Sequence, residues 1–190
     1  MVLTIAILLP LTIAIAAYIL APRFVQHRVI FDATPDRPVP FGLKMAWLAI
    51  RTRDTARVID VLGLVNPRPC NWNSGIGSVY DDELGEKHVF VSPPVSGWTF
   101  VVGLSLPYPV GRSFVDKCTP MLLRLGAEFI EVQYFFSYPP IDFFAWARIV
   151  HGRLIRAFAI GDEGTIWNRG KPTRDEKRLG LKLFELRGVR

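Results

Sequence analysis

Residues 129–168, FIEVQYFFSYPPIDFFAWARIVHGRLIRAFAIGDEGTIWN, give the clearest indication of the fold. Runs rich in aromatic and β-branched residues occupy 129–138, 143–152, 153–161 and 165–168. They are joined by a Pro-Pro pair, by His151-Gly152 and by Asp162-Glu163-Gly164, which are turn-forming sequences. The stretch therefore predicts an antiparallel meander of four strands.

Side chains alternate in character within the second run, which begins FFAWARIV. Successive residues of a strand point to opposite faces of its sheet. Positions 145, 147 and 149 carry small or aliphatic side chains, whereas the other face carries Phe144, Trp146 and Arg148. We expect the first of these faces to be packed and the second to be partly exposed.

Upstream of the meander, residues 43–63 predict a strand followed by a helix. Asp54 is placed to cap this helix and Gly63 to end it, and Ala56, Ile59 and Leu62 share one helical face. Residues 88–92 and 98–106 then form two further β-rich runs around a Pro-Pro and Gly connector.

A second helix is predicted within 113–126, SFVDKCTPMLLRLG. Ser113 and Asp116 stand at its start, and Gly126 is its expected stop. Pro120 either kinks this helix or marks its true first turn. Cys118 falls on the apolar face of the helix and is expected in the core.

Together these elements predict an α+β fold: one domain with a mainly antiparallel sheet of about seven strands and two or three helices. The domain is expected to span residues 41–190. Residues 22–40 contain prolines at 22, 35, 38 and 40, and they are predicted to form an extended spacer.

The N-terminal residues 2–21, VLTIAILLPLTIAIAAYILA, contain no charged side chain. A helix needs about 20 apolar residues to cross a bilayer, so this segment is predicted to be a transmembrane anchor in contact with lipid. The alternative is a cleaved secretory signal with Ala-Ile-Ala at 14–16 as its cleavage site. Arg23, Arg28 and Arg37 follow the segment and no base precedes it, which favours a cytoplasmic over a periplasmic domain.

Composition predicts a long loop over 66–86, NPRPCNWNSGIGSVYDDELGE, which ends in a group of acidic residues. Their spacing fits no calcium loop, so the loop is either simply solvated or a contact surface for a basic partner. Trp, Tyr and Arg dominate the energy of protein–protein contacts. The candidate partner-binding residues are therefore Asp81, Asp82, Glu83, Tyr138, Trp146 and Arg148.

Two nucleotide-binding motifs fail on inspection. The segment 164–173 imitates a phosphate-binding loop, but five residues separate its glycines and Pro172 stands where a hydroxyl is needed. A turn into a helix capped by Thr173, with Glu176 three residues on, is favoured instead. NSGIGSVY places Tyr80 where a dinucleotide fingerprint needs its third glycine.

Histidines and cysteines are too scattered to predict a metal site. His27, His88 and His151 are remote from one another, and Cys70 and Cys118 lie 48 positions apart. No catalytic, cofactor-binding or metal-binding residue is predicted. The cysteines are expected to be thiols in a cytoplasmic domain, and pairing becomes plausible in an extracytoplasmic one.

Positive charge is concentrated at the C-terminus. The chain has a formal net charge of +6, and residues 169–190 contain eight Lys or Arg against three acidic residues. Such a tail suits contact with anionic lipid. The alternative is a solvated helix face above buried Leu179, Leu183 and Leu186. Nucleic acid binding is not expected, because no recognised module is present.

Residues 97–173 resemble a group of uncharacterised bacterial proteins. The resemblance is carried by Trp-Thr at 98–99, Val-Gln-Tyr-Phe at 132–135, Trp-Ala-Arg at 146–148 and Arg-Ala-Phe at 156–158. It implies a bacterial origin and one shared domain, and it transfers neither an activity nor a site residue.

Two functional hypotheses follow from these observations. The first is a membrane-anchored, non-enzymatic protein-binding domain, such as an immunity or accessory protein for a secreted toxin. The second is an envelope enzyme of hydrolase type whose site is assembled from scattered residues, because convergent sites need no local motif. A histidine within hydrogen-bond reach of a carboxylate in a concave pocket would favour the enzyme.

Overall fold

The computed structural model describes residues 12, 14–16, 18, 29–111, 114–162 and 164–180. The chain divides into two units, Met1–Ile30 and Phe31–Arg190. The predicted anchor lies outside the described residues except at 12, 14–16 and 18, which are helical. Within the described parts of the chain, no helix has the length and apolar character needed to cross a bilayer. The expectations for Arg23, Arg28, His27, Ser113, Leu183 and Leu186 also fall outside the described residues.

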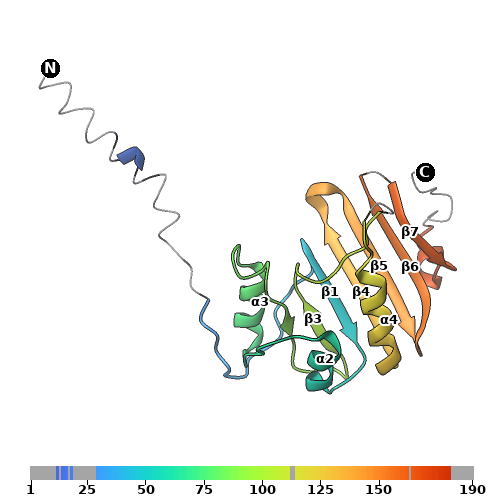
Figure 1. Ribbon diagram of the computed structural model, residues 1–190, viewed down its shortest axis with the longest axis horizontal. Helices are drawn as coiled ribbons and strands as arrows, with labels where there is room; N and C mark the ends of the chain where they lie inside the picture. The colour runs from blue at the N-terminus through green and yellow to red at the C-terminus, as the bar shows by residue number, and fades with distance from the viewer. Residues whose placement is uncertain are drawn as a thin grey trace, which may run out of the picture. The chain divides into compact units, whose positions relative to one another are not determined.

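The second unit is built on one antiparallel sheet of seven strands in the order β2-β3-β1-β4-β5-β6-β7 (Figure 1). The strands are β1 (Met45–Ile50), β2 (Phe90–Val91), β3 (Thr99–Val102), β4 (Glu131–Tyr138), β5 (Phe143–Val150), β6 (Arg153–Gly161) and β7 (Gly164–Gly170). The predicted α+β class, the seven strands and the meander of β4 to β7 are confirmed.

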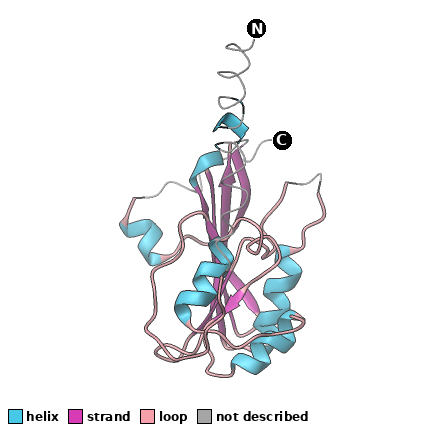
Figure 2. Cartoon of the chain, turned by 90° about the vertical axis from the view of Figure 1, so that its left-hand side faces the viewer, coloured by secondary structure: helices cyan, strands magenta, loops and turns pink. Residues whose placement is uncertain are grey.

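Helices flank both sides of the sheet, which Figure 2 shows edge-on. They are α2 (Thr55–Leu62), α3 (Trp72–Tyr80), α4 (Cys118–Glu128), α5 (Arg174–Arg178) and the short 3₁₀ helix η1 (Pro139–Ile141). The described residues therefore contain more helices than the two or three predicted. The strand-then-helix prediction for 43–63 is confirmed, with Asp54 as the N-cap and Gly63 in a left-handed C-cap.

The main core lies between one face of the sheet and helices α2 and α4. Alternate residues of the central strands point into it, together with Val58 of α2 and a row of side chains from α4. These strand residues are Ala46, Leu48, Ile50, Val132, Tyr134 and Phe136. Ala56 was predicted to face inward but is exposed, because the buried side of α2 is centred on Val58.

Helix α4 begins at Cys118, because the carboxylate of Asp116 accepts hydrogen bonds from the backbone N–H groups of Cys118 and Thr119. Pro120 lies in the first turn, where no intrahelical donor is lost. Cys118 is buried as predicted. Gly126 was expected to stop the helix, but α4 continues to Glu128. A Cβ atom at Gly126 would lie 2.4 Å from Cγ2 of Ile149, so close helix–sheet packing explains this glycine.

Helix α3 was predicted to be part of a loop, and this prediction was wrong. Its two glycines and its polar residues lower helix propensity, but tertiary contacts outweigh propensity. The Asn71 side chain accepts from the backbone N–H of Ser74, and the Asp36 carboxylate accepts from those of Trp72 and Asn73. A Cβ at Gly75 would lie 2.1 Å from the ring of Phe90. Gly75 therefore permits close packing against β2.

A second core lies on the opposite face of the sheet, under α3. It consists of Met45, Trp72, Ile76, Val79, Phe90 and Val102. Phe41 packs on this core, with its ring stacked on Trp72 and in edge contact with Trp47. Residues 31–40 of the predicted spacer belong to the second unit, where Asp36 caps α3 and Val39 packs on the second core.

Candidate partner-binding face

The face of the sheet opposite α2 and α4 is only partly covered. Helix α3 packs over β2 at one end of this face, and α5 is bonded to β6 at the other. Between these helices, five of the side chains of β4 and β5 that point to this face are half-buried or exposed aromatic or long polar groups, namely Gln133, Phe135, Phe144, Trp146 and Arg148. We call these five residues the open face. The predicted alternation of packed and exposed side chains in β5 is confirmed.

A row of aromatic residues crosses the open face from strand to strand. Trp47, Phe135, Trp146 and Phe158 lie directly opposite one another on β1, β4, β5 and β6. The rings of Trp47 and Phe135 are stacked with centroids 4.2 Å apart, and those of Trp146 and Phe158 are 4.7 Å apart. Directly opposed aromatic pairs stabilise a sheet. The row therefore supports Trp146, which is itself half-buried, on a rigid base.

Beside this row, charged groups surround the carboxylate of Glu131. Arg148 Nε donates to it at 2.8 Å, Gln133 donates at 2.9 Å, and Arg51 lies 3.7 Å away. The Glu131 side chain is only 9% exposed, whereas those of Arg148 and Arg51 are 48% and 60% exposed. The two guanidinium groups are thus held by a buried anion while they remain accessible to a partner.

The electrostatics of Glu131 are consistent with this arrangement. Burial by itself raises the pKa of a carboxyl group. For Glu131, the hydrogen bonds from Gln133 and Arg148 and the charges of Arg148 and Arg51 outweigh burial, so its pKa lies below the ordinary value. Glu131 is therefore ionised at neutral pH, and it acts as a fixed anchor for Arg148.

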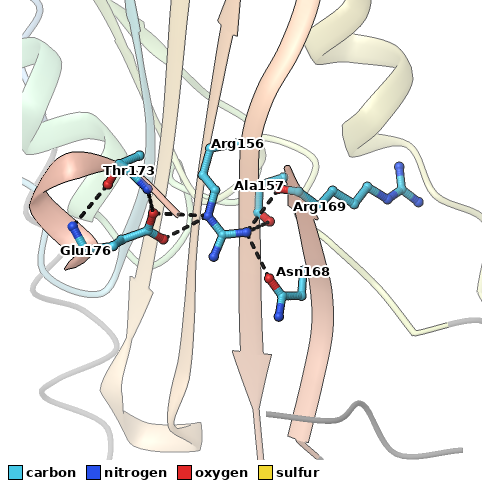
Figure 3. Close-up of polar contacts among 6 residues, drawn as sticks. All are labelled: Arg156, Ala157, Asn168, Arg169, Thr173 and Glu176. Carbon is cyan, nitrogen blue, oxygen red and sulfur yellow. Dashed lines mark hydrogen bonds and ion pairs between the residues drawn. The ribbon is translucent and has the colours of Figure 1, made fainter. Parts of the chain in front are cut away.

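The adjoining part of this face contains a buried ion pair between β6 and α5 (Figure 3). Arg156 is fully buried, and its Nε lies 2.9 Å from a carboxylate oxygen of Glu176. Its Nη1 donates to the side chain of Asn168 and to the carbonyls of Ala157 and Arg169. Glu176 also completes the predicted capping box with Thr173. The pair ties α5 to the sheet next to the open face.

The structure brings together only two of the candidate partner-binding residues. Trp146 and Arg148 both belong to the open face. Tyr138 packs against the main core beside Phe136, on the opposite face of the sheet. The acidic residues Asp81, Asp82 and Glu83 lie in the turns after α3, beyond β2.

The acidic residues after α3 differ in what they do. The Asp81 carboxylate accepts from the backbone N–H groups of Glu83 and Leu84, so it stabilises the turn. Asp82 and Glu83 are exposed. Exposure fits both interpretations of the sequence, a solvated loop and a contact surface for a basic partner. Leu179 of the C-terminal segment was expected to be buried under a basic helix face, but it is 67% exposed because α5 ends at Arg178.

Within the part of the chain that the structure describes, neither His88 nor His151 pairs with a carboxylate. Nδ1 of His88 lies 2.8 Å from the carbonyl oxygen of Leu84. His151 is exposed in the tight turn between β5 and β6, with a φ of 48°. Among the described residues, no group of three or more His, Cys, Asp and Glu side chains is arranged to hold a metal ion.

Several residues of the face were not among those predicted. Glu131, Gln133 and Arg51 form the polar contacts, and Trp47 and Phe135 extend the aromatic row. Gln133 and Phe135 follow the period-two alternation in β4 that was recognised in β5, so this signal was available in the sequence. Arg51 and Trp47 come from a strand distant in sequence, and only the pairing of β1 with β4 brings them here.

Comparisons with protein-family models, with curated protein sequences and with solved structures found no match to this chain.

Proposed function

We propose that this protein is a non-enzymatic binding domain that docks a protein partner on the open face. The observation that carries the proposal is the position of Trp146 and Arg148, which are neighbours on the same accessible face of β5. Tryptophan and arginine are the residues most enriched among those that dominate binding energy. Both are held in place before binding, Trp146 by its tilted ring contact with Phe158 and Arg148 by its hydrogen bond to Glu131. Pre-organisation of this kind lowers the entropic cost of association.

The charge of the face defines the chemistry of the partner. Two accessible guanidinium groups, those of Arg51 and Arg148, surround one buried carboxylate. The face therefore has an excess of positive charge at its polar end and aromatic surface at its other end. A complementary partner presents an acidic side chain next to an apolar one, because matched charges set both register and specificity.

We further propose that the domain acts at a membrane, to which residues 2–21 anchor it. The support is the length of that uncharged segment. An immunity or accessory protein for a secreted toxin is one role that such an anchored binding domain would fill. Full-length protein should remain in the membrane fraction after alkaline extraction, since about 20 buried apolar residues hold more strongly than a peripheral charge patch. Release of the protein in the alkaline wash would contradict the anchor.

The partner-binding proposal is tested by site-specific photocrosslinking in the native cell. A photoreactive amino acid replaces Phe144, which is 37% exposed on the open face, or Leu123, which is 43% exposed on α4. These two side chains lie on opposite sides of the sheet. A protein crosslinked from position 144 and not from position 123 is the expected result.

Two further variants link this crosslink to the proposed contacts. Arg148→Glu reverses the accessible charge, and Trp146→Ala removes the central ring. Each should lower the yield of the crosslink from position 144 about tenfold or more, because loss of a dominant contact typically costs 2 kcal/mol or more, roughly a factor of 30 in affinity. Arg124→Glu, which makes the same change of charge at an exposed residue of α4 on the other side of the sheet, is the control. Crosslinks that persist in both variants, or that appear equally from 123, would refute the open face as the binding surface.

A further inference from the structure

Two open grooves lie next to each other at the β2 edge of the sheet, the smaller between α2 and α4 and the larger reaching from α2 around the edge to Ser78 of α3. One has a volume of about 470 Å³ and the other of about 680 Å³. Leu64, Lys87 and Val89 line both of them, so the two adjoin at these residues, and we refer to them together as the groove, with a smaller and a larger part. No residue of the open face lines either part.

The smaller part of the groove is surrounded by cations. Lys87, Lys117 and Arg124 line it, and all three are exposed. Asp116 is the acidic residue in this lining, and its carboxylate already accepts from the N–H groups of Cys118 and Thr119 at the start of α4. Because those donors are occupied, the side-chain cations, and not the helix N-terminus, are the groups available to an anion here.

The larger part of the groove is mainly apolar. It runs from α2 across the 63–68 turn to β2 and to the end of the acidic turns. Its apolar lining includes Phe31, Ile59, Val65, Leu84, Phe90 and Val91. The groove thus combines a cationic end with a mainly apolar end, and the volume of each part lies in the range of small-molecule sites, roughly 300–1,000 Å³.

We propose that this groove binds an amphiphile that has one hydrocarbon chain and an anionic head group. The head group lies among Lys87, Lys117 and Arg124, and the chain extends past Leu64 and Val89 into the apolar part. Charge complementarity selects the anion, and burial of hydrocarbon supplies the affinity. The site stands apart from the proposed partner-binding face and does not depend on it.

An acidic peptide is the competing occupant, and the geometry of the edge strand argues against it. A peptide that joins a sheet needs a run of unpaired backbone groups along the edge. Strand β2 is only two residues long, and Pro93 and Pro94 follow it closely. The edge therefore offers a short template for strand addition, whereas the groove beside it is long and apolar.

The test uses the full chain in nanodiscs of zwitterionic lipid and a long-chain fatty carboxylate with a diazirine at the far end of its chain. Irradiation should label 59–65 or 89–91, and mass spectrometry locates the label. The double variant Lys87→Glu/Lys117→Glu should lower labelling about tenfold or more, because one charge-assisted hydrogen bond typically contributes at least that factor. Lys171→Glu/Lys177→Glu, with the same change of charge at two exposed lysines elsewhere, should label like wild type.

Two additional arms separate the proposal from its alternatives. Leu64→Trp fills the shared part of the groove without a change of charge and should also abolish labelling, while thermal unfolding confirms that each variant folds. A fatty alcohol probe with the same chain and diazirine has no negative charge, so its labelling of the protein should be the same in wild type and in Lys87→Glu/Lys117→Glu. The proposal is overturned by equal labelling of that variant and wild type, by labelling confined to other segments, or by an acidic peptide without an alkyl chain that displaces the probe more efficiently than unlabelled fatty carboxylate.

Discussion

Nε of Arg156 lies 2.9 Å from a carboxylate oxygen of Glu176, and both side chains are buried, so a charged contact inside the protein joins helix α5 to the sheet. Arg156 projects from β6, and Glu176 comes from a helix of five residues. So short a helix is not stable alone. Its position therefore depends on this contact and on its capping box.

Glu176→Gln should destabilise the folded chain by about 3 kcal/mol, because it leaves the buried guanidinium without its counter-ion. Glutamine retains the shape of the side chain and the capping-box bond to Thr173. The matched control is Asp175→Asn, which removes the exposed pair with Arg178 and should cost no more than about 1 kcal/mol. Urea unfolding of the three proteins gives the comparison. Equal stabilities of the two variants would show that the buried pair contributes nothing.

Acid should weaken the fold through the two buried glutamates. Burial alone raises the pKa of Glu131 and Glu176, but the hydrogen bonds and charges of their partners outweigh it, and both pKa values lie below the ordinary one. A carboxyl with a lowered folded-state pKa stabilises the fold above its unfolded pKa, near 4.3, and this contribution is lost as pH falls through the folded value. Unfolding free energy should therefore decline as pH is lowered below about 4.5. Glu131→Gln/Glu176→Gln should flatten this part of the profile, and an unchanged slope would contradict the assignment.

Replacement by alanine should destabilise the protein at Gly75 of α3 and Gly126 of α4, which permit close packing. It should not do so at Gly77, which lies in α3 and faces solvent. Gly75→Ala and Gly126→Ala place a Cβ 2.1 Å and 2.4 Å from Phe90 and Ile149, and overpacking should cost about 1–3 kcal/mol. In Gly77→Ala, the new Cβ meets nothing within 4 Å, so helix propensity should stabilise α3 by up to about 1 kcal/mol. Thermal unfolding should rank Gly77→Ala above wild type and the other two below it. Any other order would refute the packing explanation.

The two cysteines should differ in reactivity in the folded chain. The pKa of the Cys118 thiol is raised mainly by burial and to a lesser degree by the charge of Asp116. The pKa of the half-buried Cys70 is raised by burial and by the charge of Asp36. Because the thiolate is the reactive form, a maleimide should label Cys70 slowly and Cys118 only after unfolding. Without reductant, both should react once the chain is unfolded if the domain is cytoplasmic. A disulfide between them would instead favour an extracytoplasmic domain.

Local patterns predicted the strands and most helix ends, because these depend on neighbours in sequence. The alternation at 143–150, the Asp54 and Thr173 caps and the left-handed Gly63 all appear where expected. Helix α3 was missed, because its stability depends on Asp36 and on the contact of Gly75 with Phe90, which are distant in sequence. The open face was found only in part for the same reason. Trp146 and Arg148 were visible in one strand, whereas Arg51 reaches Glu131 only once β1 lies beside β4.

The position of β1 in the sheet has a consequence for biosynthesis. This apolar strand is made first, yet its neighbours are β3 and β4, which follow it by about 50 and 85 residues. Neither edge of the nascent strand has its partner until residue 102 has left the ribosome, and the second edge stays open until residue 138 has done so. Throughout that interval MAWLAI is an exposed template for aberrant pairing. Native pairing of β1 therefore has to wait for two segments that are synthesised well after it.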